Sequence, residues 1–175
     1  MNTMPLYKLL DQTTVPRVLV LGDSMLDVYT TGQAERISPE APVIVLRARE
    51  QKSLLGGAAN VCQMLRGLEA EVSCAGVIGD DESGRAVQRR LDDARIDRQL
   101  LCVDPARTTT VKERFLGSSS LRTPSQILRV DRESREPISN AIEDELLLGL
   151  CRKVPEHDAL LISDYGKGVL SLIHI

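Results

Sequence analysis

Short apolar runs alternate along this chain with segments of helical periodicity, and this alternation restricts the fold more than any other feature. The run at residues 17–22, RVLVLG, and the run at residues 159–163, ALLIS, are typical of buried strands. Residues 71–78 form another apolar segment of strand type. Strands that alternate with helices predict an α/β fold with a largely parallel sheet.

The helical segments lie between these runs. Residues 57–68 place apolar side chains three, four and seven positions apart, which predicts an amphipathic helix. A second helix is predicted at residues 84–95, and the preceding Asp80 and Asp81 suit the positive end of its dipole. A third helix is predicted from Asn140, which we expect to cap it because Glu143 completes a capping box.

Other strand-like segments are more polar. Residues 28–33 and 43–50 are separated by Pro39 and Pro42, and we expect exposed or edge strands there. Residues 108–116 are also weakly apolar. Such strands do not suit the middle of a parallel sheet, so they predict a small side sheet. Two more strands are predicted at residues 96–103 and 126–130.

Composition places the 175-residue chain among soluble one-domain proteins, with 42% hydrophobic and 27% charged residues. Its 22 basic and 25 acidic residues give a net charge of −3, which argues against nucleic-acid binding through a general basic surface. The only aromatic residues, too few for a base-stacking platform, are Tyr7, Tyr29, Phe115 and Tyr165. No membrane-spanning run and no signal-peptide pattern occur, so we expect no membrane contact and a cytoplasmic location.

The metal-ligating residue types are sparse. The cysteines are widely spaced and form no CxxC pair, so the sequence favours buried free thiols over a zinc site. We expect no metal ligands among these 175 residues. The cysteines and histidines are Cys62, Cys74, Cys102, Cys151, His157 and His174.

Carboxylates follow the apolar runs. Asp23 and Asp164 come directly after two predicted buried strands, and Asp27 lies shortly after the first. In open α/β sheets, ligands bind beyond the carboxyl ends of the strands. Because ionised carboxylates accept hydrogen bonds from hydroxyl groups, this edge suits a hydroxyl-rich ligand.

A glycine pair opens the first predicted helix, in SLLGGAANVCQML. Gly56 and Gly57 lack Cβ atoms, which lets backbone approach a ligand closely and adopt unusual dihedral angles. Free N–H groups of the helix point to the same place, and the Asn60 amide can both donate and accept there. The alternative is a plain glycine turn that opens a helix.

Seven motifs occur along the chain in this order: LGDSMLDVY, RISPEAPV, GGAAN, GDDESG, TTVKERF, QILRVDRE and SDYGKGVL. This series resembles the ribokinase-like (PfkB) carbohydrate kinases. More narrowly, it is similar to the bacterial heptose-7-phosphate kinases, which make precursors of the lipopolysaccharide core. The resemblance covers about residues 15–170, and RISPEAPV and SDYGKGVL are its most specific parts.

The resemblance implies a sugar pocket. Asp27 would accept hydrogen bonds from sugar hydroxyls, and the glycine pair with Asn60 would form the backbone and amide side of the pocket. A turn or helix cap is the alternative for Asp27. Asp164 and Lys167 would stand beside the reacting centre.

The resemblance also implies cationic groups for the phosphate of the sugar. Lys112 and Arg114 are the candidates, and Arg129 is a weaker one. Lys112 and Arg114 alternate along a strand and share a face, so a solvated edge that guards against aggregation is the alternative.

The implied architecture is a ribokinase-like sheet flanked by helices, with a small β lid at about residues 28–50 and 108–116. In this family the lid also pairs subunits, so the resemblance implies a homodimer in the full-length protein. The implied reaction transfers a phosphoryl group from ATP, with Mg²⁺, to the anomeric hydroxyl of heptose 7-phosphate, a small-molecule sugar phosphate. Neither GxGxxG nor GxxxxGK[ST] is present, so a dinucleotide fold and a P-loop are poorly supported.

The family's catalytic base lies in a GAGD motif, and this sequence contains none. We therefore expect no catalytic base within these residues and no turnover by the chain alone, with ATP and Mg²⁺ bound mainly elsewhere. The ending SLIHI departs from the family pattern. A different ribokinase-like sugar or nucleoside kinase, or a non-catalytic sugar-binding or dimerising module, remains an alternative.

Overall fold

The computed structural model describes residues 14–118 and 123–170; Tyr7, His174 and the ending SLIHI lie outside them. A four-stranded parallel sheet, sheet A, forms the body with the order β5-β4-β1-β8. Its strands are β1 (Arg17–Gly22), β4 (Glu71–Gly79), β5 (Asp97–Asp104) and β8 (Ala159–Ser163).

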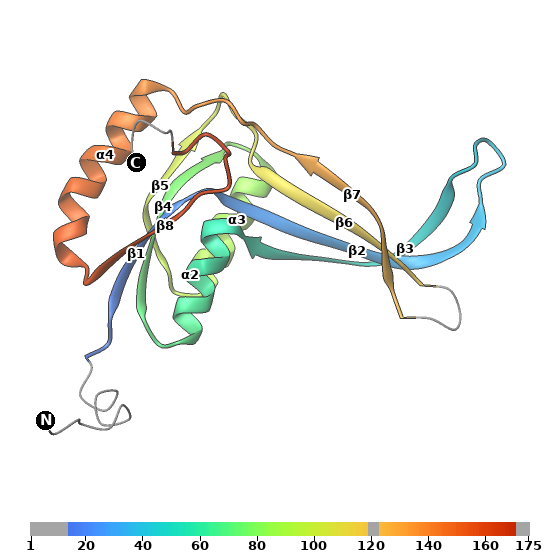
Figure 1. Ribbon diagram of the computed structural model, residues 1–175, viewed down its shortest axis with the longest axis horizontal. Helices are drawn as coiled ribbons and strands as arrows, with labels where there is room; N and C mark the ends of the chain where they lie inside the picture. Colours follow the sequence, from blue (N-terminus) through green and yellow to red (C-terminus); the bar gives the residue numbers. More distant parts are fainter. Residues whose placement is uncertain (1–13, 119–122, 171–175) are drawn as a thin grey trace, which may run out of the picture.

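Helices cover both faces of sheet A (Figure 1). Val18 and Val20 of β1 pack in the cluster that contains the apolar residues of α2 and α3, whereas Leu19 and Leu21 pack with those of α4. The predicted α/β fold with a mostly parallel sheet flanked by helices is therefore confirmed. The helices are α2 (Gly57–Gly67), α3 (Glu82–Asp93), α4 (Asn140–Lys153) and the short 3₁₀ turn η1 (Val154–Glu156). No helix of the described residues is long and apolar enough to cross a membrane.

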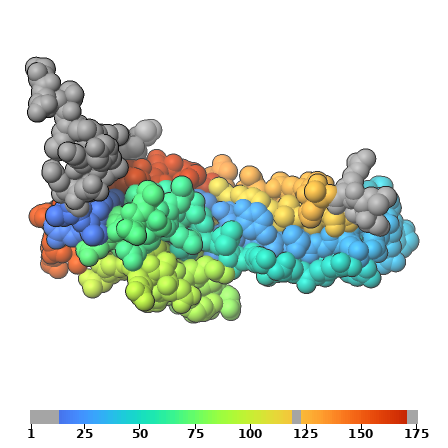
Figure 2. Space-filling view, turned by 90° about the horizontal axis from the view of Figure 1, so that it is seen from below, coloured from blue at the N-terminus to red at the C-terminus, as the bar shows by residue number. Residues whose placement is uncertain are grey.

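A second four-stranded sheet, sheet B, projects from the body, as Figures 1 and 2 show. Its order is β3-β2-β6-β7, with β2 and β6 parallel and the outer pairs antiparallel. The part of β2 nearest the body buries Met25, Leu26 and Val28. The strands are β2 (Ser24–Ile37), β3 (Ile44–Gly56), β6 (Thr110–Ser118) and β7 (Ser125–Arg132).

Burial differs from expectation in three places. The predicted edge strand at residues 28–33 lies inside β2, which pairs on both sides. The predicted buried strand β8 is largely exposed, because α4 lies over β4 and β5 rather than over β8. Cys62, Cys74 and Cys102 are buried free thiols as predicted, but Cys151 is exposed because it follows the sheet-facing Leu150 around the helix.

The residues that cap α3 and α4 test two of the sequence predictions. Ser139, not Asn140, caps α4, since its hydroxyl accepts a hydrogen bond from the Ile142 N–H at 3.4 Å. Asp81 caps α3 by accepting from the Gly84 N–H at 2.7 Å, so its predicted helix-stabilising role is confirmed. Burial acts to raise the pKa of Asp81, but hydrogen bonds from Gly84 and Thr109 hold it below the ordinary value.

Candidate functional site

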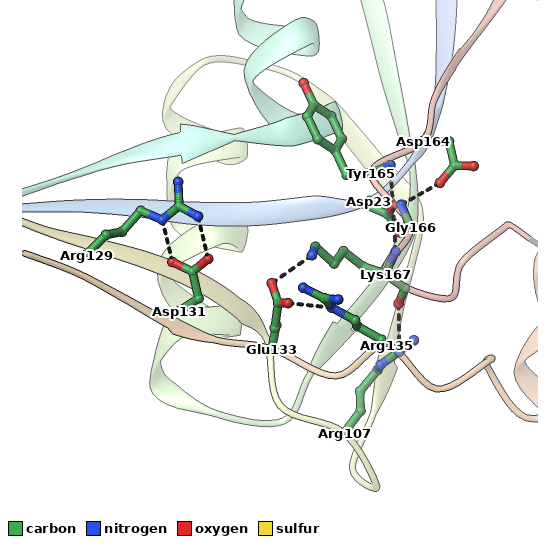
Figure 3. A network of polar contacts seen from close by, with 10 residues as sticks. All are labelled: Asp23, Arg107, Arg129, Asp131, Glu133, Arg135, Asp164, Tyr165, Gly166 and Lys167. Carbon is green, nitrogen blue, oxygen red and sulfur yellow. Dashed lines mark hydrogen bonds and ion pairs between the residues drawn. The ribbon is translucent and has the colours of Figure 1, made fainter.

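Asp23 organises the carboxyl edge of sheet A. Its side chain is buried at the end of β1, where Oδ2 accepts hydrogen bonds from the N–H groups of Tyr165 at 2.7 Å and Lys167 at 3.2 Å (Figure 3). Within the described chain Oδ1 is buried without a hydrogen-bond partner. Burial raises the pKa of Asp23, and the backbone N–H groups only partly oppose this. Asp23 thus ties the loop after β8 to β1.

The glycine pair lies against the same edge. The Ala58 N–H donates to the Asp23 carbonyl at 2.9 Å, which holds the first turn of α2 there. Gly57 has a φ of +55°, and a Cβ on it would overlap the Asp23 carbonyl oxygen. Both its dihedral angle and its packing therefore require glycine.

One face of sheet B is polar and turned away from the core. Leu26 and Val28 of β2 and Val111 of β6 point into the core, so the residues that alternate with them share the other face. In register, Lys112 lies between Asp27 and Asp131, and Arg114 lies between Tyr29 and Arg129. We call this set the polar face: Asp27, Tyr29, Lys112, Arg114, Arg129 and Asp131.

Asp27 is held by Arg114 and lies close to Gly56. Its Oδ1 accepts a hydrogen bond from Nη1 of Arg114 at 2.6 Å, and both side chains are only 21% exposed. The guanidinium also lies 5.2 Å from the centre of the Tyr29 ring. Asp27 raises the pKa of Arg114 because it stabilises the charged form. On the other side, a Cβ on Gly56 would lie 2.8 Å from Asp27 Oδ2.

The loop after β8 reaches the polar face. The Lys112 ammonium lies 5.4 Å from the centre of the Tyr165 ring, and Tyr165 is anchored through its backbone to Asp23. Arg129 pairs with Asp131 on its own strand, with Nε and Oδ1 2.9 Å apart (Figure 3). The carboxyl edge of sheet A and the polar face of sheet B therefore adjoin.

Lys167 is held by a carboxylate beyond the end of β7. Its Nζ lies 2.7 Å from Oε2 of Glu133, which also pairs with Arg135 (Figure 3). Hydrogen bonds from Lys167 and Arg135 lower the pKa of Glu133. Arg107 donates to the backbone carbonyls of Glu136 and Lys167, both at 3.0 Å. These contacts fasten the loop after β8 to the end of sheet B.

Among the described residues, two of the candidates form side-chain hydrogen bonds only with residues two or four positions away in the chain. Asn60 is exposed in the first turn of α2, and its amide nitrogen lies 3.7 Å from the Met64 sulfur. Asp164 is exposed and accepts from the Gly166 N–H at 2.8 Å. By contrast, the structure brings Asp27 into direct contact with Arg114 and places its carboxylate close to Gly56.

Sequence reasoning did not select several residues of this arrangement as site residues. Tyr165 was available as the neighbour of Asp164 in SDYGKGVL, and Tyr29 as the next same-face residue after Asp27. Asp131 and Glu133 follow Arg129 at alternate positions. Their partners depend on strand register, which the sequence does not specify.

The other edge of sheet A is not the candidate site. A cavity of about 460 Å³ lies there, lined among others by Arg17, Glu71, Arg95 and His157 at the amino ends of the strands. Ligands of open α/β sheets bind at the carboxyl ends instead. No cluster of three or more potential metal ligands occurs in residues 14–118 and 123–170.

The chain is similar to curated proteins over most of its length. The chain is 43% identical over 156 residues to the bifunctional protein HldE of Helicobacter hepaticus, a match that covers 89% of this chain and 31% of that protein. It is 44% identical over 154 residues to HldE of Paramagnetospirillum magneticum, covering 88% and 30%. The chain thus spans about a third of the length of these curated relatives.

Solved structures share the fold. A putative ribokinase from Agrobacterium tumefaciens superposes with a TM-score of 0.59 at 18% identity, covering 85% of this chain and 44% of the other. Arabidopsis thaliana ribokinase complexed with ribose and ATP gives a TM-score of 0.58 at 17% identity, covering 85% and 45%. A family model described as pfkB family carbohydrate kinase matches residues 15–123. The chain therefore belongs to the pfkB family of carbohydrate kinases.

Proposed function

We propose that this chain forms the sugar-binding side of an ATP-dependent kinase for heptose 7-phosphate. The observation that carries the proposal is the Asp27 carboxylate, which Arg114 holds beside Gly56 at the junction of the polar face and the carboxyl edge of sheet A. A fixed carboxylate accepts hydrogen bonds from sugar hydroxyls without losing side-chain freedom on binding. The heptose-kinase motif series and the HldE relatives favour heptose 7-phosphate over other sugars.

The proposed reaction transfers the γ-phosphoryl group of ATP to the anomeric hydroxyl, in the synthesis of lipopolysaccharide core precursors. In this proposal Asp27 and the backbone near Gly56 and Gly57 orient the sugar, and Lys112 faces its phosphate. ATP with Mg²⁺ supplies the phosphoryl group and neutralises its charge. The sequence lacks GAGD, so we assign the catalytic base to no residue of this chain and expect no turnover by it alone.

Calorimetric titration of the chain with heptose 7-phosphate, fructose 6-phosphate and adenosine tests this function. We expect the heptose phosphate to bind most tightly and Asp27→Asn to abolish most of its affinity. Equal or tighter binding of fructose 6-phosphate or adenosine would favour another ribokinase-like kinase. If the chain binds none of the three ligands, the proposal is contradicted.

We also propose that the protein is a cytoplasmic homodimer that pairs through sheet B. Exposed apolar side chains on the outer strands of sheet B, among them Ile44 and Leu128, support this pairing. The cytoplasm is the compartment that supplies the ATP the reaction needs.

A further inference from the structure

The Arg114 guanidinium makes more contacts with the protein than a side chain that is free to bind a phosphate group would make. Its Nη1 donates to Asp27 Oδ1 at 2.6 Å and contacts the Lys112 carbonyl at 3.4 Å, while the guanidinium lies over the Tyr29 ring. Four-fifths of its side chain is buried. A charge-assisted hydrogen bond of this length, shielded from water, is strong, so the pair is costly to separate.

The contacts of Asp27 explain what this pairing achieves. Arg114 engages Oδ1, and the missing Cβ of Gly56 leaves room for Oδ2. Arg114 thereby restricts the carboxylate, and the remaining lone pairs of Asp27 are available to hydroxyl donors. Without Arg114, the carboxylate would be free to rotate and would lose its counter-ion.

Lys112 provides the contrast on the same face. In the described part of the chain no ion pair joins Lys112 to an acid, and its ammonium is held only over the Tyr165 ring. An ammonium on an aromatic face keeps donors free for an anion. Lys112 is therefore the matched cation against which the role of Arg114 can be measured.

We infer that Arg114 is a positioning residue, which holds Asp27 in the orientation that accepts sugar hydroxyls and does not itself bind the phosphate of the sugar. The inference rests on the proposed sugar-binding function. It predicts that the contribution of Arg114 to sugar affinity depends on Asp27. This contribution should be the same with and without the phosphate group of the sugar, because the guanidinium acts only through the carboxylate.

A double-mutant cycle with two probes, heptose and heptose 7-phosphate, tests the inference. Calorimetry would measure both affinities for the wild type, Arg114→Gln, Asp27→Asn, the double variant and Lys112→Gln. We expect Arg114→Gln to weaken both sugars by the same factor, about 10- to 100-fold, which corresponds to loss of one charge-assisted hydrogen bond. The double variant should bind within about threefold of Asp27→Asn, because contacting residues are not additive.

The control variants separate positioning from phosphate binding. Lys112→Gln should weaken heptose 7-phosphate and leave heptose unchanged. Arg114→Lys should recover part of the affinity for both sugars, since it keeps the charge but not the geometry of the guanidinium. If Arg114→Gln does not give a folded chain by circular dichroism, Arg114→Lys replaces it in the cycle.

Two results would overturn the inference while leaving the proposed function intact. One is a loss on Arg114→Gln confined to the phosphorylated sugar, and the other is a loss that adds fully to that of Asp27→Asn. A folded wild-type chain that binds neither sugar would instead overturn the proposed function, and the positioning role with it.

Discussion

At the scale of single residues, Gly56 and Gly57 must be glycine for different physical reasons, although the sequence alone does not distinguish them. Gly57 is required by its own backbone, since its φ is +55° and the Asp23 carbonyl occupies the space of a Cβ. Gly56 is required by a side chain, since Asp27 Oδ2 would lie 2.8 Å from its Cβ. The sequence indicated close approach at both positions. It did not indicate that the approaching groups belong to the protein itself.

Gly57→Ala should therefore destabilise the fold. An L-residue forced into the left-handed region costs about 1–3 kcal/mol, and the overlap with Asp23 adds to this. Urea unfolding followed by circular dichroism measures the loss. Gly67→Ala is the matched control, because a Cβ there meets nothing within 4 Å and should leave stability nearly unchanged or slightly raised. Equal stability of Gly57→Ala and wild type would contradict the packing account.

Gly56→Ala should act on the ligand as well. The added methyl group presses on the Asp27 carboxylate and on Met25, so the variant should bind heptose 7-phosphate at least tenfold more weakly. Calorimetric titration of the folded variant is the measurement, again with Gly67→Ala as control. Unchanged affinity would mean that the position of Asp27 does not depend on Gly56.

Asp23 should make stability depend on pH in a defined direction. Its folded-state pKa is raised above the ordinary 3.8 because the carboxyl is buried, so ionisation is harder in the folded than in the unfolded chain. Wild-type stability relative to Asp23→Asn should therefore fall as pH rises from about 3.8 through the raised pKa, and then level off. Unfolding free energies of both chains between pH 3 and pH 8 would show this trend; a difference that rises with pH would contradict it.

At the scale of elements, local periodicity predicted where strands and helices lie better than how they are buried. The polar residues of β2 suggested an edge strand, but polar side chains alternate there with Leu26 and Val28, which enter the core. In β8 the apolar run suggested burial, yet α4 does not extend over it. Burial depends on which helix covers which strand, and no local pattern encodes that placement.

The ion pair between Lys167 and Glu133 should control how firmly the loop after β8 is attached to sheet B. The pKa of Glu133 is lowered below its ordinary 4.5, so its stabilising effect is present above that pH and lost as pH falls through the lowered value. Glu133→Gln should increase hydrogen exchange at the Lys167 and Gly168 amides at pH 7. The difference from wild type should disappear in acid.

The exposed Glu40 provides the matched control for this prediction. Glu40→Gln removes the same charge from the connection between β2 and β3, which lies at the end of sheet B away from the body (Figure 1), and should leave exchange at these amides unchanged. Equal protection of Lys167 and Gly168 in Glu133→Gln and wild type would show that the backbone bonds to Asp23 and Arg107 suffice.

At the scale of the whole molecule, sequence motifs identified the residues of the candidate site but not its geometry. Asp27, Gly56 and Arg114 were each singled out, and the placement of Asp27 between the other two follows from the pairing of β2 with both β3 and β6. β3 follows β2 directly in the chain, but β6 is distant in sequence, so the pairing of β2 with β6 is what brings Arg114 to Asp27. The same register leaves two outer strands of sheet B, β3 and β7, with free edges among the described residues.

The free strand edges of sheet B predict how the protein associates. Ile44 of β3 and Leu128 of β7 are 50% and 54% exposed, and apolar side chains on free strand edges favour pairing with another chain. A second copy is the partner we expect, joined by a symmetric interface. Sedimentation velocity at micromolar concentration should show a dimer for the wild type.

A charge placed in that interface should dissociate it. Ile44→Asp should shift the chain to a monomer, because burying an unpaired carboxylate costs several kcal/mol. Leu148→Asp is the control: Leu148 is 60% exposed on α4, which lies on the body away from sheet B, and this variant should remain dimeric. A wild-type monomer would refute pairing, and a dimer broken by Leu148→Asp instead of Ile44→Asp would place the interface on the body, at α4.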